Sequence, residues 1–300
     1  MKVKRGLISV IICTCFLLMM AGCGGKKEIK IEAVTDMGNL KYSCGYDGKE
    51  RTYLEYKPDG DAKGILFMLH GYGSNPESFQ NDTGMHIEAG KRGYVVIYVA
   101  GIRNEKDSSA SSGWNAGIGD SEIDDIGFLN ALAKYMQQKY GLTRDDTFAA
   151  GYSNGAFMMH RIATEGQENF AAVASVAGMM PEKVWVSRPD TNQISVLQIS
   201  GSKDDVIPMY YNGSDHNSKN PPMEDVIAYY ASANGLTQMQ TESLTEKVLV
   251  TKYKEQGKKE QVWHVFIEGG RHSWPDEKLW GFNTNSLILD FFDQVHYSEK

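Results

Sequence analysis

The chain has 300 residues and a formal net charge of −7, and 41% of its residues are hydrophobic, 11% aromatic and 23% charged. This length is enough for one large domain with its own core, and the acidic balance argues against nucleic acid as a partner, because nucleic-acid-binding proteins need a basic surface. Cys13, Cys15 and Cys23 lie near the amino terminus, which leaves Cys44 without a partner for an intramolecular disulfide or a cysteine-based zinc site.

The amino terminus is predicted to be a targeting segment. A basic start precedes an apolar run from Leu7 to Met20, which is shorter than the roughly 20 residues of a membrane span and typical of a signal peptide. The sequence Met20-Ala21-Gly22-Cys23 then resembles the lipobox of bacterial lipoproteins. That resemblance implies a signal peptide at residues 1–22 and lipid on Cys23, and thus a protein anchored on the extracellular face of the bacterial membrane. An ordinary signal peptide with secretion, or an uncleaved anchor, is the alternative.

Residues 23–45 are polar and weakly patterned, so a tether is expected there, followed by a single folded domain at 46–300. In that domain, residues 52–56 alternate as in an edge strand, whereas 64–69 and 94–99 are continuous apolar runs typical of strands buried on both faces. Further strands are predicted at 147–150, 170–176, 194–200, 247–253 and 262–267. Helices are predicted at 84–91, 121–140, 154–165, 223–234 and 285–295, the second of these opened by a capping box of Ser121 and Asp124.

Strands that alternate with helices in this order predict an α/β fold, with a mostly parallel central sheet and helices on both of its faces. No internal repeat and no second domain is evident. The segment 101–119 is rich in Gly, Ser and Asn and has no period, and a loop of that length in a compact domain is usually functional.

A candidate nucleophile lies between a predicted strand and a predicted helix. The sequence Gly151-Tyr152-Ser153-Asn154-Gly155 matches the pattern G-x-S-x-G. Small flanking residues allow a turn so tight that the serine hydroxyl stands clear of the sheet, at the positive end of the following helix. The five-residue pattern by itself is moderately specific, and its position between strand and helix strengthens the assignment of Ser153 as the nucleophile.

Acyl transfer from such a serine also needs hydrogen-bond donors for the developing oxyanion. One is expected to be the backbone N–H of Asn154, the residue after the nucleophile. The loop His70-Gly71-Tyr72-Gly73 follows an early buried strand and would supply the second donor, which we assign to the N–H of Tyr72, with Gly71 as the alternative. His70 is expected to hold this loop in place.

The general base must be a histidine, and a carboxylate must orient it. His272 follows the predicted strand at 262–267, which is where the last member of a Ser–acid–His series falls in α/β hydrolases. The acid should follow an intermediate strand, and Asp204 and Asp205 both stand directly after the strand at 194–200. Reasoning from the residues leaves both open. The remaining histidines lie in predicted strands, helices or polar loops without a supporting pattern.

Several motifs occur in a fixed order along the chain. Segments 70–73, 114–117, 124–129, 151–155, 201–204 and 270–275 carry the sequences HGYG, WNAG, DDIGFL, GYSNG, GSKD and GRHSWP. With these motifs the chain resembles, from about residue 51 onward, the polyhydroxybutyrate depolymerase, feruloyl esterase and acetylxylan esterase family, carbohydrate-esterase relatives of esterase D. The resemblance implies an α/β-hydrolase fold, Asp204 as the acid, His272 as the base, and no metal or cofactor.

The chain also departs from this family. Many members have a cysteine pair after the WNAG segment, whereas this chain has Ile118-Gly119-Asp120-Ser121. It also has no attached carbohydrate- or polymer-binding module, which favours soluble or short esters over an insoluble polyester. Trp114 and Trp274 are candidates for stacking on an aromatic acid or a sugar, and bracing of the loop and of the histidine is the equally plausible structural role.

These observations predict a serine carboxylic-ester hydrolase that acts through an acyl-enzyme on a small-molecule, oligosaccharide or oligoester substrate. Feruloyl or acetyl esters of plant polysaccharide and hydroxyalkanoate oligomers are the candidate substrates. A surface acyltransferase of the same fold, or a lipoprotein that binds an ester or glycan without turnover, are the alternatives. The sequence does not indicate an oligomeric state.

Overall fold

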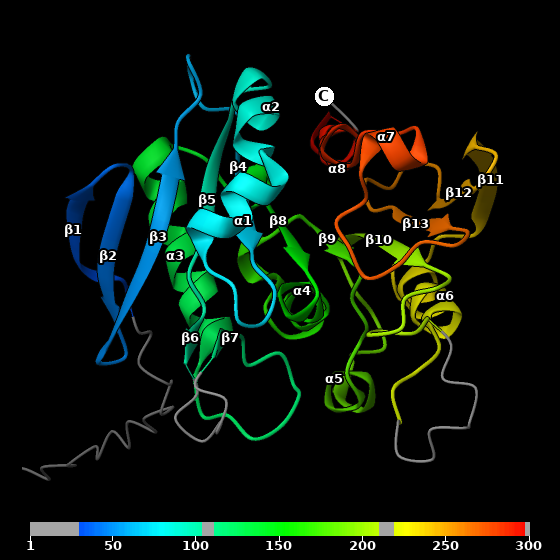
Figure 1. Ribbon diagram of the computed structural model, residues 1–300, viewed down its shortest axis with the longest axis horizontal. Helices are drawn as coiled ribbons and strands as arrows, with labels where there is room; N and C mark the ends of the chain where they lie inside the picture. Colours follow the sequence, from blue (N-terminus) through cyan, green and yellow to red (C-terminus); the bar gives the residue numbers. More distant parts are fainter. Residues whose placement is uncertain (1–29, 104–110, 210–218, 298–300) are drawn as a thin grey trace, which may run out of the picture.

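The computed structural model describes residues 30–103, 111–209 and 219–297 of the chain. Its centre is an eleven-stranded sheet with the strand order β1-β2-β3-β5-β4-β8-β9-β10-β13-β12-β11 (Figure 1). The strands from β5 to β13 in this order are parallel to one another. They are β5 (Tyr94–Val99), β4 (Gly64–Leu69), β8 (Thr147–Tyr152), β9 (Ala172–Val176), β10 (Ser195–Gly201) and β13 (Val262–Ile267).

Antiparallel strands extend this parallel centre at both edges. On one side are β3 (Lys49–Tyr56), β2 (Lys41–Tyr46) and β1 (Glu32–Gly38). On the other are β12 (Val248–Lys254) and β11 (Gln238–Thr245). The predicted edge strand at 52–56 is therefore interior, since β2 pairs with β3 on the side away from β5.

The prediction of a tether through residue 45 is wrong over residues 32–45, which form most of the β1–β2 hairpin. The hairpin is held by backbone pairing, and β1 is exposed along almost its whole length, so no apolar alternation marks it in the sequence. The predicted signal peptide at 1–22 and the lipid site at Cys23 lie outside the described residues. Within the described residues, no helix combines the length and apolar character needed to cross a bilayer.

Helices cover both faces of the sheet (Figure 1). On one face, α3, α4, α5 and α6 pack on a core that includes Ile65, Phe67 and Leu69 of β4. On the other face, α1, α2 and α8 pack on Leu66 and Met68 of the same strand, which alternates between the two cores. The helices are α1 (Pro76–Thr83), α2 (Met85–Lys91), α3 (Asp125–Tyr140), α4 (Asn154–Glu165), α5 (Glu182–Ser187), α6 (Met223–Ala233), α7 (Glu277–Trp280) and α8 (Thr284–Tyr297). The predicted α/β architecture is confirmed.

Two helix starts differ from the sequence predictions. The helix predicted from residue 84 is the second of two, because Gly84 takes a left-handed φ of 57° that ends α1 before α2 begins. The helix predicted from residue 121 begins at Asp125, and Asp124 caps it by accepting a 2.9 Å hydrogen bond from the N–H of Gly127. Ser121 is not part of this cap, since its hydroxyl accepts from the N–H of Ile123 instead.

Candidate active site

Ser153 occupies a sharp turn between β8 and α4. Its backbone angles, a φ of 53° and a ψ of −116°, lie in a region that residues other than glycine rarely adopt, so the turn is strained. The flanking glycines are required by close packing: a Cβ at Gly151 would lie 2.3 Å from the Gly155 carbonyl oxygen, and one at Gly155 would lie 2.2 Å from the Leu69 carbonyl oxygen. Tight backbone contact on both sides therefore holds the serine in its strained conformation.

Ser153, His272 and Asp204 form one hydrogen-bonded chain. The Nδ1 atom of His272 lies 2.8 Å from Oδ2 of Asp204, and its Nε2 atom lies 2.9 Å from Oγ of Ser153. Because an ionised carboxylate only accepts hydrogen bonds, Nδ1 carries the ring proton and Nε2 is left to accept from the serine hydroxyl. This is the arrangement of nucleophile, base and orienting acid that serine acyl transfer requires.

Asp204 and its neighbour Asp205 have different environments. The Asp204 side chain is 2% exposed, whereas Asp205 is exposed. The second carboxylate oxygen of Asp204, Oδ1, accepts from the backbone N–H groups of Val206 at 3.0 Å and Ile207 at 2.7 Å. These bonds fix the plane of the carboxylate, so Oδ2 points toward His272.

The loops that carry Asp204 and His272 are packed together through glycines. A Cβ at Gly201 would lie 2.4 Å from the carbonyl oxygen of Gly270, so neither loop tolerates a side chain at the contact. The backbone N–H of Lys203 donates to that same carbonyl at 2.8 Å, and the hydroxyl of Ser202 accepts from the N–H of Gly269 at 2.8 Å. The spacing of Asp204 and His272 is therefore set by direct contact between their backbones.

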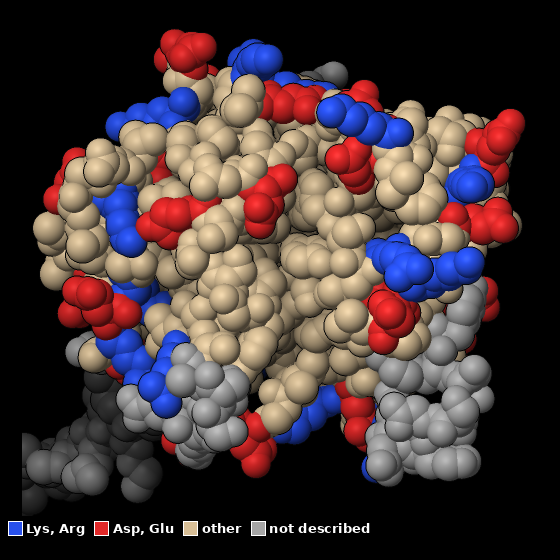
Figure 2. Space-filling model, in the orientation of Figure 1, with Lys and Arg blue, Asp and Glu red and all other residues tan. Residues whose placement is uncertain are grey.

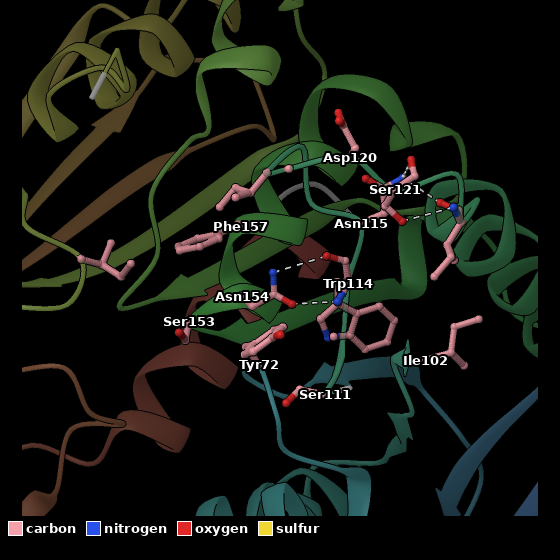
Figure 3. Close-up of a pocket in the computed structure, with 15 residues that line it drawn as sticks. Tyr72, Ile102, Ser111, Trp114, Asn115, Asp120, Ser121, Ser153, Asn154 and Phe157 are labelled. Atoms are coloured by element: carbon pink, nitrogen blue, oxygen red, sulfur yellow. Dashed lines mark hydrogen bonds between the residues drawn. The ribbon is translucent and has the colours of Figure 1, made fainter. Parts of the chain in front are cut away.

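A second network joins the start of α4 to the loop after β4. The Asn154 Oδ1 atom accepts from the backbone N–H of Trp114 at 2.7 Å (Figure 3). The indole Nε1–H of Trp114 in turn donates to the carbonyl of His70 at 2.9 Å. Trp114 is 6% exposed, so both bonds lie inside the protein. Trp114 is therefore fixed to the start of α4 through Asn154 and to the loop after β4 through His70.

His70 holds its own loop. Its Nε2 atom accepts from the N–H of Gly101 at 2.9 Å, so Nδ1 carries the proton and donates to the carbonyl of Gly71 at 2.7 Å. Burial lowers the pKa of His70, which keeps the ring neutral. A Cβ at Gly71 would lie 3.4 Å from the Ser153 Cβ, so the backbone of this loop runs directly beside Ser153.

Tyr72 and Asn154, whose backbone amides are the expected oxyanion donors, line the same cavity as Ser153. Asn154 is the first residue of α4, and the first N–H groups of a helix have no partner within the helix. Tyr72 is 51% exposed, and a Cβ at Gly113 would lie 2.9 Å from its ring. The ring therefore covers the backbone of the segment that Asn154 holds.

A cavity of about 710 Å³ opens beside Ser153. Figure 3 shows Ser153 and Phe157 on one side of it and Ile102 on the other, with Tyr72, Asn154 and Trp114 between them. Most of its walls are apolar, and no Lys, Arg or His is among the described residues that line it. The lining residues are Tyr72, Ile102, Ser111, Gly113, Trp114, Asn115, Ile118, Gly119, Asp120, Ser121, Ile123, Ser153, Asn154, Phe157 and Ile207.

The two candidate tryptophans lie in different places. Trp114 lines the cavity and also braces the loop through its indole N–H. Trp274 is not among the described residues that line the cavity: it packs edge-on against Phe79, with ring centroids 5.7 Å apart, and donates its indole N–H to Asn285 at 3.2 Å. These contacts anchor the loop that carries His272 two residues before Trp274.

Several lining residues, Phe157 and Ile207 among them, were not named individually as site residues from the sequence. Phe157 follows Ser153 by four positions, and this helical spacing places both on one side of α4, a signal that was available in the sequence. Ile207 lines the cavity while its N–H bonds Asp204, and only the turn after Asp204 brings it there.

Uncharged residues occupy the centre of one face of the molecule. Figure 2 shows them in the middle of the viewed face, with most Lys, Arg, Asp and Glu side chains toward its edges. In residues 30–103, 111–209 and 219–297, no group of three or more His, Cys, Asp or Glu side chains is arranged to hold a metal ion.

The sheet order, the helices on both faces and the turn at Ser153 define an α/β-hydrolase fold. Acetyl xylan esterase from Aspergillus awamori has the same fold, with a TM-score of 0.58 at 16% sequence identity over 81% of this chain and 94% of that protein. No family model matches the sequence.

Among proteins of known name, the chain is similar to esterases. It is 28% identical over 171 residues to the putative esterase NocK of Nocardia uniformis subsp. tsuyamanensis, a match that covers 54% of this chain and 47% of that protein. It is 29% identical over 119 residues to feruloyl esterase B of Talaromyces stipitatus, over 38% of this chain and 32% of that protein. The chain thus spans about half or less of the length of these curated relatives.

Proposed function

We propose that this protein is a serine carboxylic-ester hydrolase, with Ser153 as nucleophile, His272 as general base and Asp204 as the orienting acid. The observation that carries the proposal is the unbroken chain of 2.8 Å and 2.9 Å hydrogen bonds from Asp204 through His272 to Ser153. The esterase names of the similar proteins agree with it. A protein that only bound esters would not need a base aligned on a strained serine.

The reaction proceeds in two steps. The Ser153 oxygen attacks the ester carbonyl carbon as His272 Nε2 takes the hydroxyl proton, and the backbone amides of Tyr72 and Asn154 stabilise the negative oxygen that forms. His272 then gives the proton to the departing alcohol oxygen, which leaves an acyl group on Ser153. A water molecule, deprotonated by His272, attacks this acyl-enzyme and releases the carboxylic acid, and the proton returns to Ser153.

Short or aromatic acyl esters are the proposed substrates. The apolar walls around Phe157 and Trp114 suit an acyl group of that kind, and a cavity of about 710 Å³ is within the size of small-ligand sites. Feruloyl or acetyl esters of plant polysaccharide fit this description, as do hydroxyalkanoate oligomers. We further propose that the domain is attached to the outer face of a bacterial membrane through lipid on Cys23, with residues 1–22 removed as a signal peptide.

The proposal is tested with a panel of esters and a single substitution. Wild type and Ser153→Ala are compared on p-nitrophenyl acetate and butyrate, methyl ferulate, acetylated xylan and a hydroxybutyrate oligomer. Loss of the nucleophile should lower kcat by a factor on the order of 10⁴ to 10⁶ on each ester that wild type cleaves.

The matched control is Ser187→Ala, an exposed serine at the end of α5 that does not line the cavity beside Ser153. It should retain wild-type rates. If Ser153→Ala keeps wild-type activity, or if folded wild type cleaves none of the esters, the proposed function is wrong. Binding of an ester without turnover would then be the leading explanation of the cavity.

A further inference from the structure

Tyr152, the residue directly before the nucleophile, contacts the residue that supplies the base. Its hydroxyl donates to the main-chain carbonyl of His272 at 3.2 Å. Its ring centroid lies 5.2 Å from the centroid of the His272 imidazole, with the two planes inclined by 35°. One side chain, attached next to Ser153, thus contacts both the backbone and the ring of His272.

The same ring also borders the loop that follows β4. A Cβ at Gly71 would lie 3.2 Å from Cδ1 and 3.5 Å from Cε1 of Tyr152, and 3.4 Å from the Cβ of Ser153. Tyr152 therefore packs against the backbone beside Tyr72, one of the assigned oxyanion donors. It is the common neighbour of the nucleophile, the base and this loop.

The segment around His272 is anchored mainly at some distance from the imidazole. Before His272 it is held at Gly270, whose carbonyl accepts from Lys203, and after His272 it is held at Trp274, which bonds Asn285. The side chains on either side of His272, those of Arg271 and Ser273, are exposed. The bond from Tyr152 acts at the His272 main chain itself, where it restricts tilting of the Cα–Cβ bond that directs the ring.

A packing role would not require a hydroxyl, because phenylalanine fills the same space. The half-buried phenol of Tyr152 has its donor pointed at a carbonyl that belongs to the base residue. Burial, followed by the nearby charge of Asp204, raises the pKa of Tyr152 to about 12. The hydroxyl therefore remains a donor throughout the neutral range.

We propose that Tyr152 is a positioning residue for His272, which aligns the imidazole between Ser153 and Asp204 by holding the His272 carbonyl and packing against the ring. This inference rests on the proposed function, in which His272 transfers the proton. It predicts that removal of the hydroxyl alone disturbs proton transfer, while removal of the whole ring also disturbs the loop at Gly71.

The test compares Tyr152→Phe, Tyr152→Leu and a matched control, Tyr94→Phe. Tyr94 lies in β5, and its hydroxyl donates to Asp293 at 2.8 Å, so the control also loses one tyrosine hydrogen bond. We measure kcat, KM and the pH dependence of kcat/KM on p-nitrophenyl butyrate, together with urea unfolding. The NMR resonance of the His272 Nδ1 proton is recorded for each variant, because it reports the hydrogen bond to Asp204 independently of turnover.

Tyr152→Phe should lower kcat about 3- to 10-fold with little change in KM, as expected for one hydrogen bond lost at the reacting geometry. The His272 resonance and the midpoint of the pH profile should both move. Tyr152→Leu should lower kcat by about 10²-fold, because a misplacement of the order of 1 Å is enough for such a loss. Tyr94→Phe should leave kcat, the pH profile and the resonance unchanged.

The inference is overturned if Tyr152→Phe keeps the wild-type kcat, pH profile and His272 resonance, or if it is altered only to the extent that Tyr94→Phe is. Failure of the proposed function is recognised separately, since Ser153→Ala would then retain activity. In that case the His272 resonance decides the matter: a shift in Tyr152→Phe supports the positioning role, and an unchanged resonance refutes it.

Discussion

Replacement of Asn154 by alanine should affect both stability and turnover, because this side chain holds the segment at Trp114 against the start of α4. The variant loses a 2.7 Å bond and leaves the backbone N–H of Trp114 without that acceptor, in a region where Asn154 is 9% and Trp114 6% exposed. A buried donor left unsatisfied costs about 1–3 kcal/mol, so we expect Asn154→Ala to lower the free energy of unfolding by that amount.

The catalytic consequence follows from the next bond in the network. The indole of Trp114 holds the His70 carbonyl, and His70 begins the loop that contributes the Tyr72 amide. If the segment at Trp114 loosens, the proposed oxyanion donors are less well ordered, so we expect kcat to fall by about 10- to 100-fold. Removal of a whole donor can lower kcat by up to about 10³-fold. Urea unfolding gives the stability change, and hydrolysis of p-nitrophenyl butyrate gives kcat.

Asn154→Asp is the informative control. It keeps an oxygen that can accept from Trp114, so the free energy of unfolding should change less than in Asn154→Ala. It also places a negative charge beside the developing oxyanion, so kcat should fall with only a modest loss of stability. A wild-type kcat and unfolding curve for Asn154→Ala would refute the reasoning. A destabilised Asn154→Ala with unchanged kcat would restrict the network to a role in folding.

Three further predictions follow from the buried groups around the site. Burial lowers the pKa of His160 to about 4. Between about pH 6.5 and 4, only the unfolded state therefore takes up this proton. The free energy of unfolding should fall by about 3 kcal/mol as the pH drops through that range. Urea unfolding of His160→Gln across the range should give a flatter profile than wild type, and equal slopes would contradict this. The Arg51 side chain is 1% exposed and lies 2.6 Å from Asp125. Asp125→Asn removes its counter-ion, so the free energy of unfolding should fall by about 3–5 kcal/mol. A fall of less than about 1 kcal/mol in urea unfolding would argue against a strong pair. Phe157→Ala widens the cavity beside Ser153, so the ratio of kcat/KM for p-nitrophenyl octanoate to that for the acetate should rise, and an unchanged ratio would place the acyl group elsewhere.

The elements that could be predicted from the sequence are those with a strong apolar signal. The runs at 64–69 and 94–99 coincide with β4 and β5, and the helix at 154–165 coincides with α4. A strand buried on both faces is apolar at every position, and this pattern does not depend on where the strand lies in the sheet. By contrast, β11 is exposed along most of its length and was not predicted, because its backbone pairing with β12 leaves no trace in the side-chain pattern.

The candidate site, too, could be predicted only in part from the sequence. The residues alone predicted where along the chain a nucleophile and a base should stand, since the turn at Ser153 and the loop at His272 each follow a strand. They did not separate Asp204 from Asp205, nor Trp114 from Trp274. Adjacent side chains on a loop point in different directions according to backbone dihedral angles, and those angles depend on contacts such as Gly201 against Gly270.

The sequence by itself therefore determined the class of fold, the positions of its buried strands along the chain and the motifs that follow them. Burial and tight turns constrain the residue type locally, so these features are visible in the sequence. Only the tertiary structure decided which of these motifs meet. It brings together Ser153 and His272, 119 positions apart, and reveals Tyr152 as their common neighbour. The physical reason is that contacts between strand ends depend on sheet order and loop packing, which no local pattern of side chains records.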